Sequence, residues 1–269
     1  MLEKTKVVFL GSRPLGAFAL KTLRAMDDID VVAYVVRKPP SRAWWTDDPF
    51  DLVDSGFKKF NSHEELMGLD FDLGVSINYW KIMPPELIAP PRLGFINLHH
   101  AFNLSLRGRN MTAHAILNAR RENSWFHGSC LHYTDDGLDT GPIIASSACE
   151  ITEFDTGWSL FNKVEILGQS LIKEWFPRLL AAKIPAAFPQ ANHPMNKRIT
   201  DDDEKFIQNI HADPLMTYDL VRAFDFNGHY RGMFTRVDGV EVDLTVEKDR
   251  GSRVLLKIDS QRKIYEVKR

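Results

Sequence analysis

Apolar and polar residues alternate along the first half of the chain in blocks typical of successive strands and helices. Residues 5–10 (TKVVFL) form an apolar run that ends at a glycine, and apolar positions at helical spacing follow it. Similar runs, short enough for strands buried on both faces, cover residues 29–36, 73–77 and 94–98. A short helix is expected at residues 63–69. Repeated strand–helix alternation predicts an α/β fold with a doubly wound, mostly parallel, Rossmann-like sheet.

Four further elements are typical of the same layered fold. They are a helix at Thr112–Asn118, two β runs at Ser129–Tyr133 and Ile143–Ala148, and a long amphipathic helix at residues 157–181. Near Pro189–Lys197 the composition shifts to Pro, Asn and His, as in a linker. We therefore divide the chain into a larger domain, residues 1–190, and a small C-terminal α+β domain, residues 191–269. The small domain is expected to hold a helix near residues 215–224 and strands around an Asp238-Gly239 turn.

Composition narrows the functional classes. The chain is 44% hydrophobic and 26% charged, and its net charge of −2 argues against a large basic surface for nucleic acid. No apolar run approaches the ~18 residues of a membrane span, and the first run is too short for a signal peptide. Cys130 and Cys149 fall in strand-like segments without metal-ligand spacing, so we expect buried reduced thiols. These features predict a cytoplasmic protein that binds neither nucleic acid nor membrane.

The first glycine turn resembles a dinucleotide-binding turn only in part. Residues 11–16 read GSRPLG, which lacks the middle glycine that lets a backbone approach a pyrophosphate. A strand-to-helix turn with Pro14 near the first helical position explains this segment better. An NAD(P)-dependent oxidoreductase is therefore only a minor alternative.

Polar side chains end the strand expected at residues 94–98. Asn97 and His99 are two residues apart, so they project to the same side at the carboxyl edge, where open α/β sheets bind ligands. An amide donor and an imidazole can together polarise a carbonyl and stabilise an oxyanion. The alternative is that both are strand-end residues satisfied by the loop backbone. His100 points to the opposite side from His99 and no carboxylate or Cys stands at ligand spacing, so no metal is expected.

A second polar segment follows the β run that ends at Tyr133. Residues 134–144 read TDDGLDTGPII, a glycine turn that contains Asp139. Asp139 has two readings: a turn residue that closes a local hydrogen bond, or a carboxylate that orients the His99 ring. Spacing alone does not bring Asp139 to His99.

Two motifs resemble those of one known family. Residues 97–108 (NLHHAFNLSLRG) resemble the N-[IL]-H-x-S-L-L-P-x-Y-R-G signature of the folate-dependent formyltransferases, which include the sugar N-formyltransferases and methionyl-tRNA formyltransferase. Residues 127–144 resemble the family's downstream G-[VC]-T-x-H and [LI]-D-x-G-x-I segment at the expected distance. Residues 78–84 match a Y-x-x-I-[LI]-P turn, and residues 220–224 (LVRAF) are similar to an appendage helix. The resemblance covers roughly residues 5–225.

The resemblance implies a reaction and a site. By position, the catalytic residues of the family fall on Asn97, His99 and Asp139. The implied activity is N-formyl transfer from 10-formyltetrahydrofolate by direct attack of a neutral amine, without a metal or a nucleophilic side chain. The implied pterin pocket lies between two loops and would use Tyr79, Trp80, Ile82, Met83, Asp135, Gly137 and Leu138. The aromatic pair Tyr79 and Trp80 has core packing as an equal alternative.

The acceptor is less closely defined than the reaction. Ala101, Leu104 and Leu106 replace the usual Ser, Pro and Tyr of the signature, and Cys130 replaces a common Thr. The short C-terminal part and the acidic run 201–204 disfavour tRNA. A nucleotide-linked amino sugar fits better, as in polysaccharide biosynthesis. The candidates for its diphosphate are Lys81, Arg107 and Arg109, and the alternative role for any one of them is a surface salt bridge. The alternatives are another amine acceptor, including methionyl-tRNA, or a folate-binding protein without activity. The C-terminal strands are compatible with a homodimer.

Overall fold

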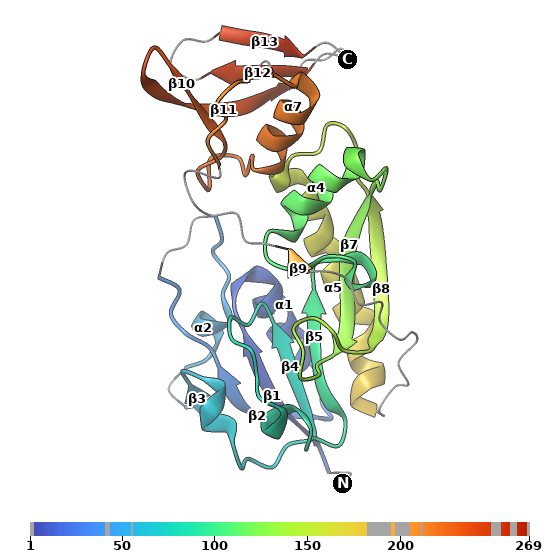
Figure 1. Ribbon diagram of the computed structural model, residues 1–269. Coiled ribbons are helices and arrows are strands. Elements are labelled where there is room, and N and C mark those ends of the chain that lie inside the picture. The colour runs from blue at the N-terminus through green and yellow to red at the C-terminus, as the bar shows by residue number, and fades with distance from the viewer. Residues whose placement is uncertain are drawn as a thin grey trace. The chain divides into compact units, whose positions relative to one another are not determined.

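A computed structural model gives the fold of the chain (Figure 1). It describes residues 3–40, 44–54, 56–181, 195–196, 205–210, 212–248, 254–258 and 263–267. Contacts divide the chain into a first unit, Met1–Arg107, Gly128–Ala148 and Val164–Pro194, and a second unit, Gly108–His127, Cys149–Lys163 and Met195–Arg269. The domain boundary at residues 190/191, the linker apart from residues 195–196, and the acidic run 201–204 lie outside the described residues. The proposed domain limits therefore stay a prediction.

The core of the first unit is the sheet that the apolar runs predict. Its strands are β1 (Thr5–Gly11), β2 (Ile29–Val35), β3 (Lys59–Phe60), β4 (Leu73–Ile77), β5 (Gly94–His99), β7 (Phe126–Tyr133) and β8 (Ile143–Glu150). Their order is β3-β2-β1-β4-β5-β7-β8. Strands β3 to β5 pair in parallel and β7 pairs antiparallel with β5, which confirms the α/β, mostly parallel fold class.

Both faces of this sheet are buried. Outside this sheet, the helices, 3-10 turns and short strands as far as residue 223 are α1 (Arg13–Arg24), α2 (Pro49–Leu52), η1 (His63–Leu66), α3 (Pro85–Ile88), η2 (Phe102–Leu104), β6 (Arg107–Gly108), α4 (Met111–Arg121), α5 (Gly157–Ala181), β9 (Met195–Asn196) and α7 (Pro214–Ala223). Val7 and Phe9 pack with α1 and α5, whereas Val8 and Leu10 pack with η1 and α3. Successive residues of a strand point to opposite faces, so a continuous apolar run is what a two-sided core requires.

Two local expectations were wrong. The helix predicted at residues 63–69 is the single 3-10 turn η1, because Gly68 adopts a left-handed conformation (φ 79°) just after it. Cys130 is buried as expected, but Cys149 is only half-buried. Cys149 lies near the end of β8, which is an edge strand with a neighbour on one side only.

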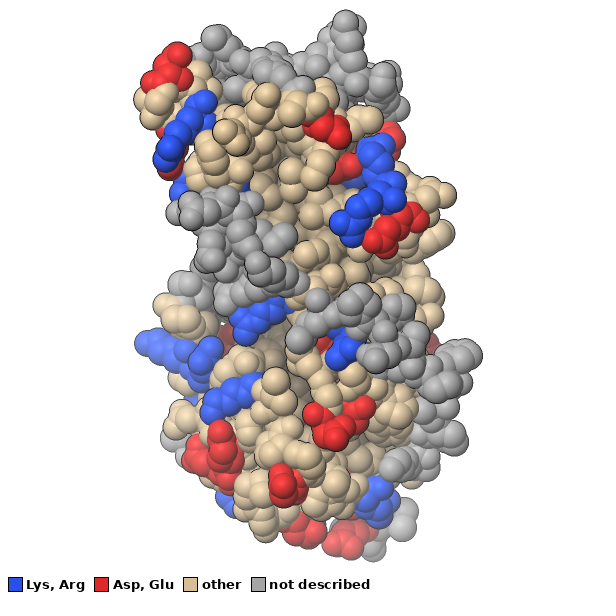
Figure 2. Space-filling view, viewed as in Figure 1, with Lys and Arg blue, Asp and Glu red and all other residues tan. Residues whose placement is uncertain are grey.

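Charged side chains are scattered over the surface. On the face that Figure 2 shows, Lys and Arg of the described residues form separate small groups and no continuous basic band. None of the helices in the described part of the chain has the length and apolarity that a membrane crossing requires.

The C-terminal part of the second unit combines one helix with an antiparallel sheet. The strands β10 (Phe234–Val237), β11 (Val240–Lys248), β12 (Val254–Ile258) and β13 (Lys263–Val267) pair in sequence order. The turn predicted at Asp238-Gly239 joins β10 to β11, and both residues have positive φ (51° and 81°), as a two-residue hairpin turn requires. Helix α7 begins at Pro214, and the Asp213 side chain caps it by accepting from the Met216 amide.

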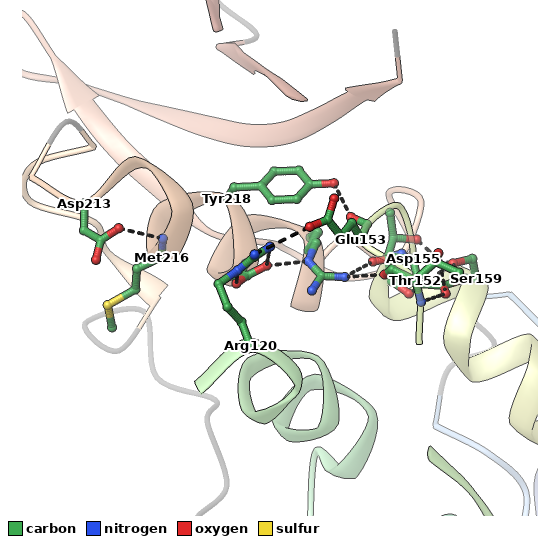
Figure 3. A network of polar contacts seen from close by, with 11 residues as sticks. Arg120, Thr152, Glu153, Asp155, Ser159, Asp213, Met216 and Tyr218 are labelled. Atoms are coloured by element: carbon green, nitrogen blue, oxygen red, sulfur yellow. Dashed lines mark hydrogen bonds and ion pairs between the residues drawn. The ribbon is translucent and has the colours of Figure 1, made fainter. Parts of the chain in front are cut away.

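A buried charge network holds α7 to other parts of the second unit (Figure 3). The Asp219 carboxylate accepts from Arg120 Nε at 2.6 Å and from Arg222 Nε at 2.7 Å. Arg222 is fully buried, and its Nη1 donates to the carbonyls of Thr152 and Asp155, both at 3.0 Å. One carboxylate therefore compensates two guanidinium groups that come from α4 and α7.

We predict that Asp219→Ala destabilises the protein strongly, because it leaves the Arg222 charge buried without a carboxylate. The expected loss in the free energy of unfolding, measured by urea denaturation, is about 3–5 kcal/mol. Glu241→Ala is the matched control, since Glu241 pairs with Arg231 and Arg236 on the surface of the same unit and should matter little. Equal losses in the two variants would contradict this account of the network.

Candidate active site

The carboxyl end of β5 carries the two polar residues that the sequence singles out. Asn97 and His99 project to one side of the strand, while Leu98 between them is buried in the core. Strand β7 runs antiparallel beside β5, and this register places His132 opposite Asn97. The pairing therefore brings a third polar side chain to the strand end.

His132 fixes the orientation of the Asn97 amide. The His132 Nδ1 atom lies 2.8 Å from the Tyr133 carbonyl, which can only accept, so Nδ1 carries the proton. In the neutral ring, Nε2 is then an acceptor, and Asn97 Nδ2 donates to it at 3.1 Å. The second N–H of the Asn97 amide and its oxygen remain available for other partners.

The environment of His132 keeps the ring neutral. Burial lowers the pKa of His132 to about 4, and the nearby positive charge of His99 acts in the same direction, against the Asp139 carboxylate. Sequence analysis assigned no role to this residue, although it belongs to the downstream motif. The signal is its place in β7, which is buried from His127 onward, because a buried polar side chain is expected to have a specific partner.

The structure brings Asp139 to His99. His99 Nδ1 lies 3.5 Å from Asp139 Oδ1, and His99 Nε2 lies 2.8 Å from the Leu106 carbonyl oxygen. Only 7% of the His99 side chain and 10% of the Asp139 side chain are exposed. Both ring nitrogens thus face oxygen acceptors, and only the doubly protonated ring can donate to both. The Asp139 contact is an ion-pair distance rather than a short hydrogen bond.

The loop between β7 and β8 holds Asp139 in a specific conformation. Asp139 has a positive φ of 50°, which Asp tolerates better than most residues. Asp135 closes the loop by accepting from the Gly137 amide and the Thr140 hydroxyl. A Cβ at Gly141 would clash with the Tyr133 carbonyl, so the loop returns to β8 through a position that requires glycine.

The loop after β5 departs from the formyltransferase signature in shape as well as in sequence. Leu104, which replaces the usual Pro, has φ 54°, whereas proline is restricted to φ near −65°. This loop carries the Leu106 carbonyl that accepts from His99. The substitutions therefore change the backbone that surrounds the imidazole.

The segment after β4 presents aromatic side chains on a rigid support. The Tyr79 hydroxyl accepts from the His63 backbone amide at 3.2 Å and bonds to His63 Nδ1 at 2.9 Å. Burial raises the pKa of Tyr79 to about 12, so the phenol stays protonated. Its O–H donates a hydrogen bond to His63 Nδ1. The Trp80 ring contacts both the Tyr79 ring and the Arg37 guanidinium. Sequence analysis missed His63 because its partner is sixteen residues away.

The other residues predicted for the folate pocket differ in how far they are buried. Ile82 is 67% exposed, whereas Met83 is buried in the core together with part of Tyr79. Leu138 is half-buried, and its carbonyl accepts from Arg107 Nε at 2.9 Å. Arg107 thus supports the loop that carries Asp139.

Two of the cations suggested for the substrate lie in different surroundings. Lys81 Nζ forms an ion pair with Glu64 at 3.0 Å. Arg109 is exposed and belongs to the second unit. Within the described ranges, no group of three or more His, Cys, Asp or Glu side chains is arranged to hold a metal ion.

His100 and Glu165 form a second buried pair beside the site. His100 Nε2 lies 3.2 Å from Glu165 Oε1 on α5, and both side chains are about 10% exposed. Burial, with smaller effects from the charges of His99 and Arg13, lowers the pKa of His100 to about 3. Burial raises the pKa of Glu165 to about 7, against the opposing effect of Arg13. At neutral pH the His100 ring is therefore uncharged, and the Glu165 carboxyl is only partly ionised.

The fold and the site together define a doubly wound α/β protein with an amide, an imidazole and a carboxylate at the carboxyl edge of its sheet. The model of the formyl transferase family matches residues 24–175, and the chain belongs to this family. The resemblance identified from the two motifs is thereby confirmed.

The chain is similar to individual known proteins at moderate to low sequence identity. A methionyl-tRNA formyltransferase of Staphylococcus aureus is 29% identical over 212 residues, which are 74% of this chain and 67% of the relative. A likely sugar N-formyltransferase from Mycobacterium tuberculosis has a TM-score of 0.71 at 21% identity, over 92% of this chain and 100% of that one. The N-formyltransferase from Helicobacter canadensis, solved with folinic acid and dTDP-3-aminofucose, has a TM-score of 0.68 at 18% identity, over 97% and 100%. At these identities the two structures show a shared fold.

The buried Glu165 carboxyl makes a prediction for the pH dependence of stability. Between its ordinary pKa of 4.5 and about 7, folded protein holds a proton that the unfolded chain releases, so this group lowers stability as the pH rises. Glu165→Gln removes the effect. Relative to wild type, the free energy of unfolding of the variant should therefore rise by about 1.4 kcal/mol per pH unit in that window.

Urea denaturation at a series of pH values measures this difference. Glu174→Gln, a change at an exposed glutamate of the same helix, is the matched control. A Glu165→Gln curve that runs parallel to the control across the window would show that the carboxyl is not buried as described.

Proposed function

We propose that this chain is an N-formyltransferase that moves the formyl group of 10-formyltetrahydrofolate to the primary amine of a nucleotide-linked amino sugar. The observation that carries the proposal is the convergence of Asn97, His99 and Asp139 from two separate segments at one edge of the sheet. Membership of the formyl transferase family supports the reaction class. The roles of the three residues and the identity of the acceptor belong to the proposal.

For this reaction the site must stabilise an oxyanion and allow one proton to move from the amine to the folate. A bond forms between the amine nitrogen and the formyl carbon, the bond from that carbon to N10 of the folate breaks, and a proton passes from the amine to N10. Asn97 offers its second N–H to the developing oxyanion, because His132 holds the first. His99 contributes Nε2–H when it turns from the Leu106 carbonyl, and Asp139 compensates the imidazolium charge.

The donor is proposed to lie between the segment after β4 and the loop between β7 and β8. The His63-anchored Tyr79 ring and the exposed Ile82 supply apolar surface for a pterin. The loop also contains the Thr134 hydroxyl, which is buried and forms no hydrogen bond within the described residues. A buried hydroxyl without a partner is costly, which is expected where a ligand completes the bonding.

The acceptor proposal rests on two supports. One structurally similar protein is an N-formyltransferase solved with folinic acid and dTDP-3-aminofucose. The described surface in Figure 2 also lacks the continuous basic band on that face that a tRNA backbone favours. Methionyl-tRNA is the second candidate, because a methionyl-tRNA formyltransferase is among the relatives. A cytoplasmic location and a homodimer stay predictions.

A direct assay tests the acceptor. The protein is incubated with 10-formyltetrahydrofolate and a panel of nucleotide-linked amino sugars, with methionyl-tRNA as the competing acceptor. We expect a mass gain of one formyl group on a nucleotide sugar only. Formylation of the tRNA alone would move the proposal to the second candidate, and folate binding without turnover on any amine would favour a binding protein.

Single substitutions test the assigned roles. His99→Ala should lower kcat for formyl transfer about 100- to 1,000-fold, the usual effect of losing one oxyanion donor. Asp139→Asn should lower kcat about 100-fold or more, because the amide cannot compensate the imidazolium. Asp136→Asn, a change at an exposed neighbour in the same loop, is the control and should leave kcat unchanged. Near-normal turnover in His99→Ala would refute the mechanism.

A further inference from the structure

Two arginines at the carboxyl edge of the sheet lie on indole rings. Arg13 begins α1 directly after β1, and its guanidinium carbon is 5.5 Å from the centre of the Trp45 ring. Arg37 follows β2, and its guanidinium carbon is 4.2 Å from the centre of the Trp80 ring. A guanidinium on an aromatic face is held flat, which leaves the N–H groups at its edge free to bind another group.

The strand order places both arginines at the end of β1. Strand β1 lies between β2 and β4, so an Arg37 side chain that reaches Trp80 beyond β4 spans the end of β1. The ends of β1 and β4 are tied directly, because the Ser12 hydroxyl donates to the Asn78 carbonyl at 2.7 Å. Arg13 is the next residue after Ser12. Its charge also acts on His100 at the end of β5, which places it within electrostatic range of the proposed active site.

Within the described residues no ion pair joins a carboxylate to either guanidinium, although Arg13 acts electrostatically on the buried Glu165 carboxyl. The nearest candidate, Asp48, is buried and accepts from the backbone amide of Arg13 at 3.0 Å and from Trp45 Nε1 at 3.3 Å. Asp48 thus fixes the Arg13 backbone and its indole rather than the guanidinium. The contrast is Lys81, whose charge Glu64 already compensates. Two guanidinium groups therefore lie at the ends of neighbouring strands, and neither forms an ion pair within the described residues.

The conformation of Arg13 indicates that its position is specified. Arg13 has φ 65°, a left-handed conformation that costs about 1–2 kcal/mol for a residue with a Cβ. Strain of this kind concentrates at binding and active sites, where the surrounding structure maintains it. Here the surrounding structure is the Asp48 carboxylate and the Ser12–Asn78 contact.

We propose that Arg13 and Arg37 bind the diphosphate of the acceptor, in place of the cations Lys81, Arg107 and Arg109 suggested by sequence. The inference rests on the proposed function. Flat guanidinium groups bind phosphate oxygens through paired N–H donors, and two such groups match the two phosphates of a nucleoside diphosphate. The indoles Trp45 and Trp80 hold them for that contact. The acceptor is thereby anchored at β1 while its amine reaches toward β5.

Binding of a nucleoside diphosphate to the full-length protein tests this assignment. Titration with dTDP or UDP, followed by calorimetry and by the fluorescence of the adjacent indoles, gives the Kd. We expect Arg13→Met and Arg37→Met each to weaken binding about 10- to 100-fold, the usual effect of losing charge-assisted hydrogen bonds. The KM for 10-formyltetrahydrofolate should not change.

Arg24→Met is the matched control. The Arg24 guanidinium also lies on aromatic rings, those of Tyr34 and Phe57, but it donates to the Leu52 carbonyl on another part of the sheet. This variant should bind the diphosphate like wild type.

Three results would overturn the assignment. The first is an unchanged Kd in Arg13→Met and Arg37→Met. The second is a rise in the KM for the folate donor in these variants, which would assign the arginines to the carboxylates of the donor. The third is that neither diphosphate binds to the wild-type protein. The proposed formyl transfer is judged separately, by whether the protein deformylates or transfers from 10-formyltetrahydrofolate in a way that His99→Ala abolishes.

Discussion

The hydrogen bond from His132 Nδ1 to the Tyr133 carbonyl is the constraint on which the proposed site depends. Because this carbonyl only accepts, the bond determines the tautomer of a buried imidazole. That tautomer makes Nε2 an acceptor and turns the Asn97 amide so that its nitrogen faces inward. One N–H of Asn97 is thereby committed, and the other is presented at the strand end beside His99. A backbone bond within β7 thus sets the direction of a side chain on β5.

Burial gives the surrounding charges their effect. His99 and Asp139 are almost fully enclosed, so their interaction is screened less than a surface ion pair. Burial lowers the pKa of His100 and raises that of Glu165, so the first is uncharged and the second only partly ionised at neutral pH, which limits the net charge beside the imidazole. The guanidinium groups of Arg13 and Arg37 supply positive charge at the neighbouring strand ends. The edge of the sheet therefore has two regions. In one, proposed for catalysis, the charges are largely compensated, and the other, proposed for binding the substrate, is cationic.

Periodicity predicted the central strands β1 and β4 closely, because each is buried on both faces and leaves a continuous apolar run. The i, i+2 spacing of Asn97 and His99 likewise predicted their common side. The approach of Asp139 came only through family resemblance, since a contact across forty residues depends on the pairing of β5 with β7. The indole rings that contact Arg13 and Arg37 were missed for the same reason. Side-chain contacts between distant segments leave no pattern in a single sequence.

The protonation pattern of His132 tests this account most directly, through ¹⁵N NMR of its imidazole in the labelled full-length protein. The account predicts one neutral tautomer, protonated at Nδ1 and bare at Nε2, that persists from about pH 5 to pH 8 because the pKa is lowered to about 4. A ring protonated at Nε2, or one that titrates near its ordinary value of 6.5, would contradict the orientation assigned to Asn97 and with it the proposed oxyanion site.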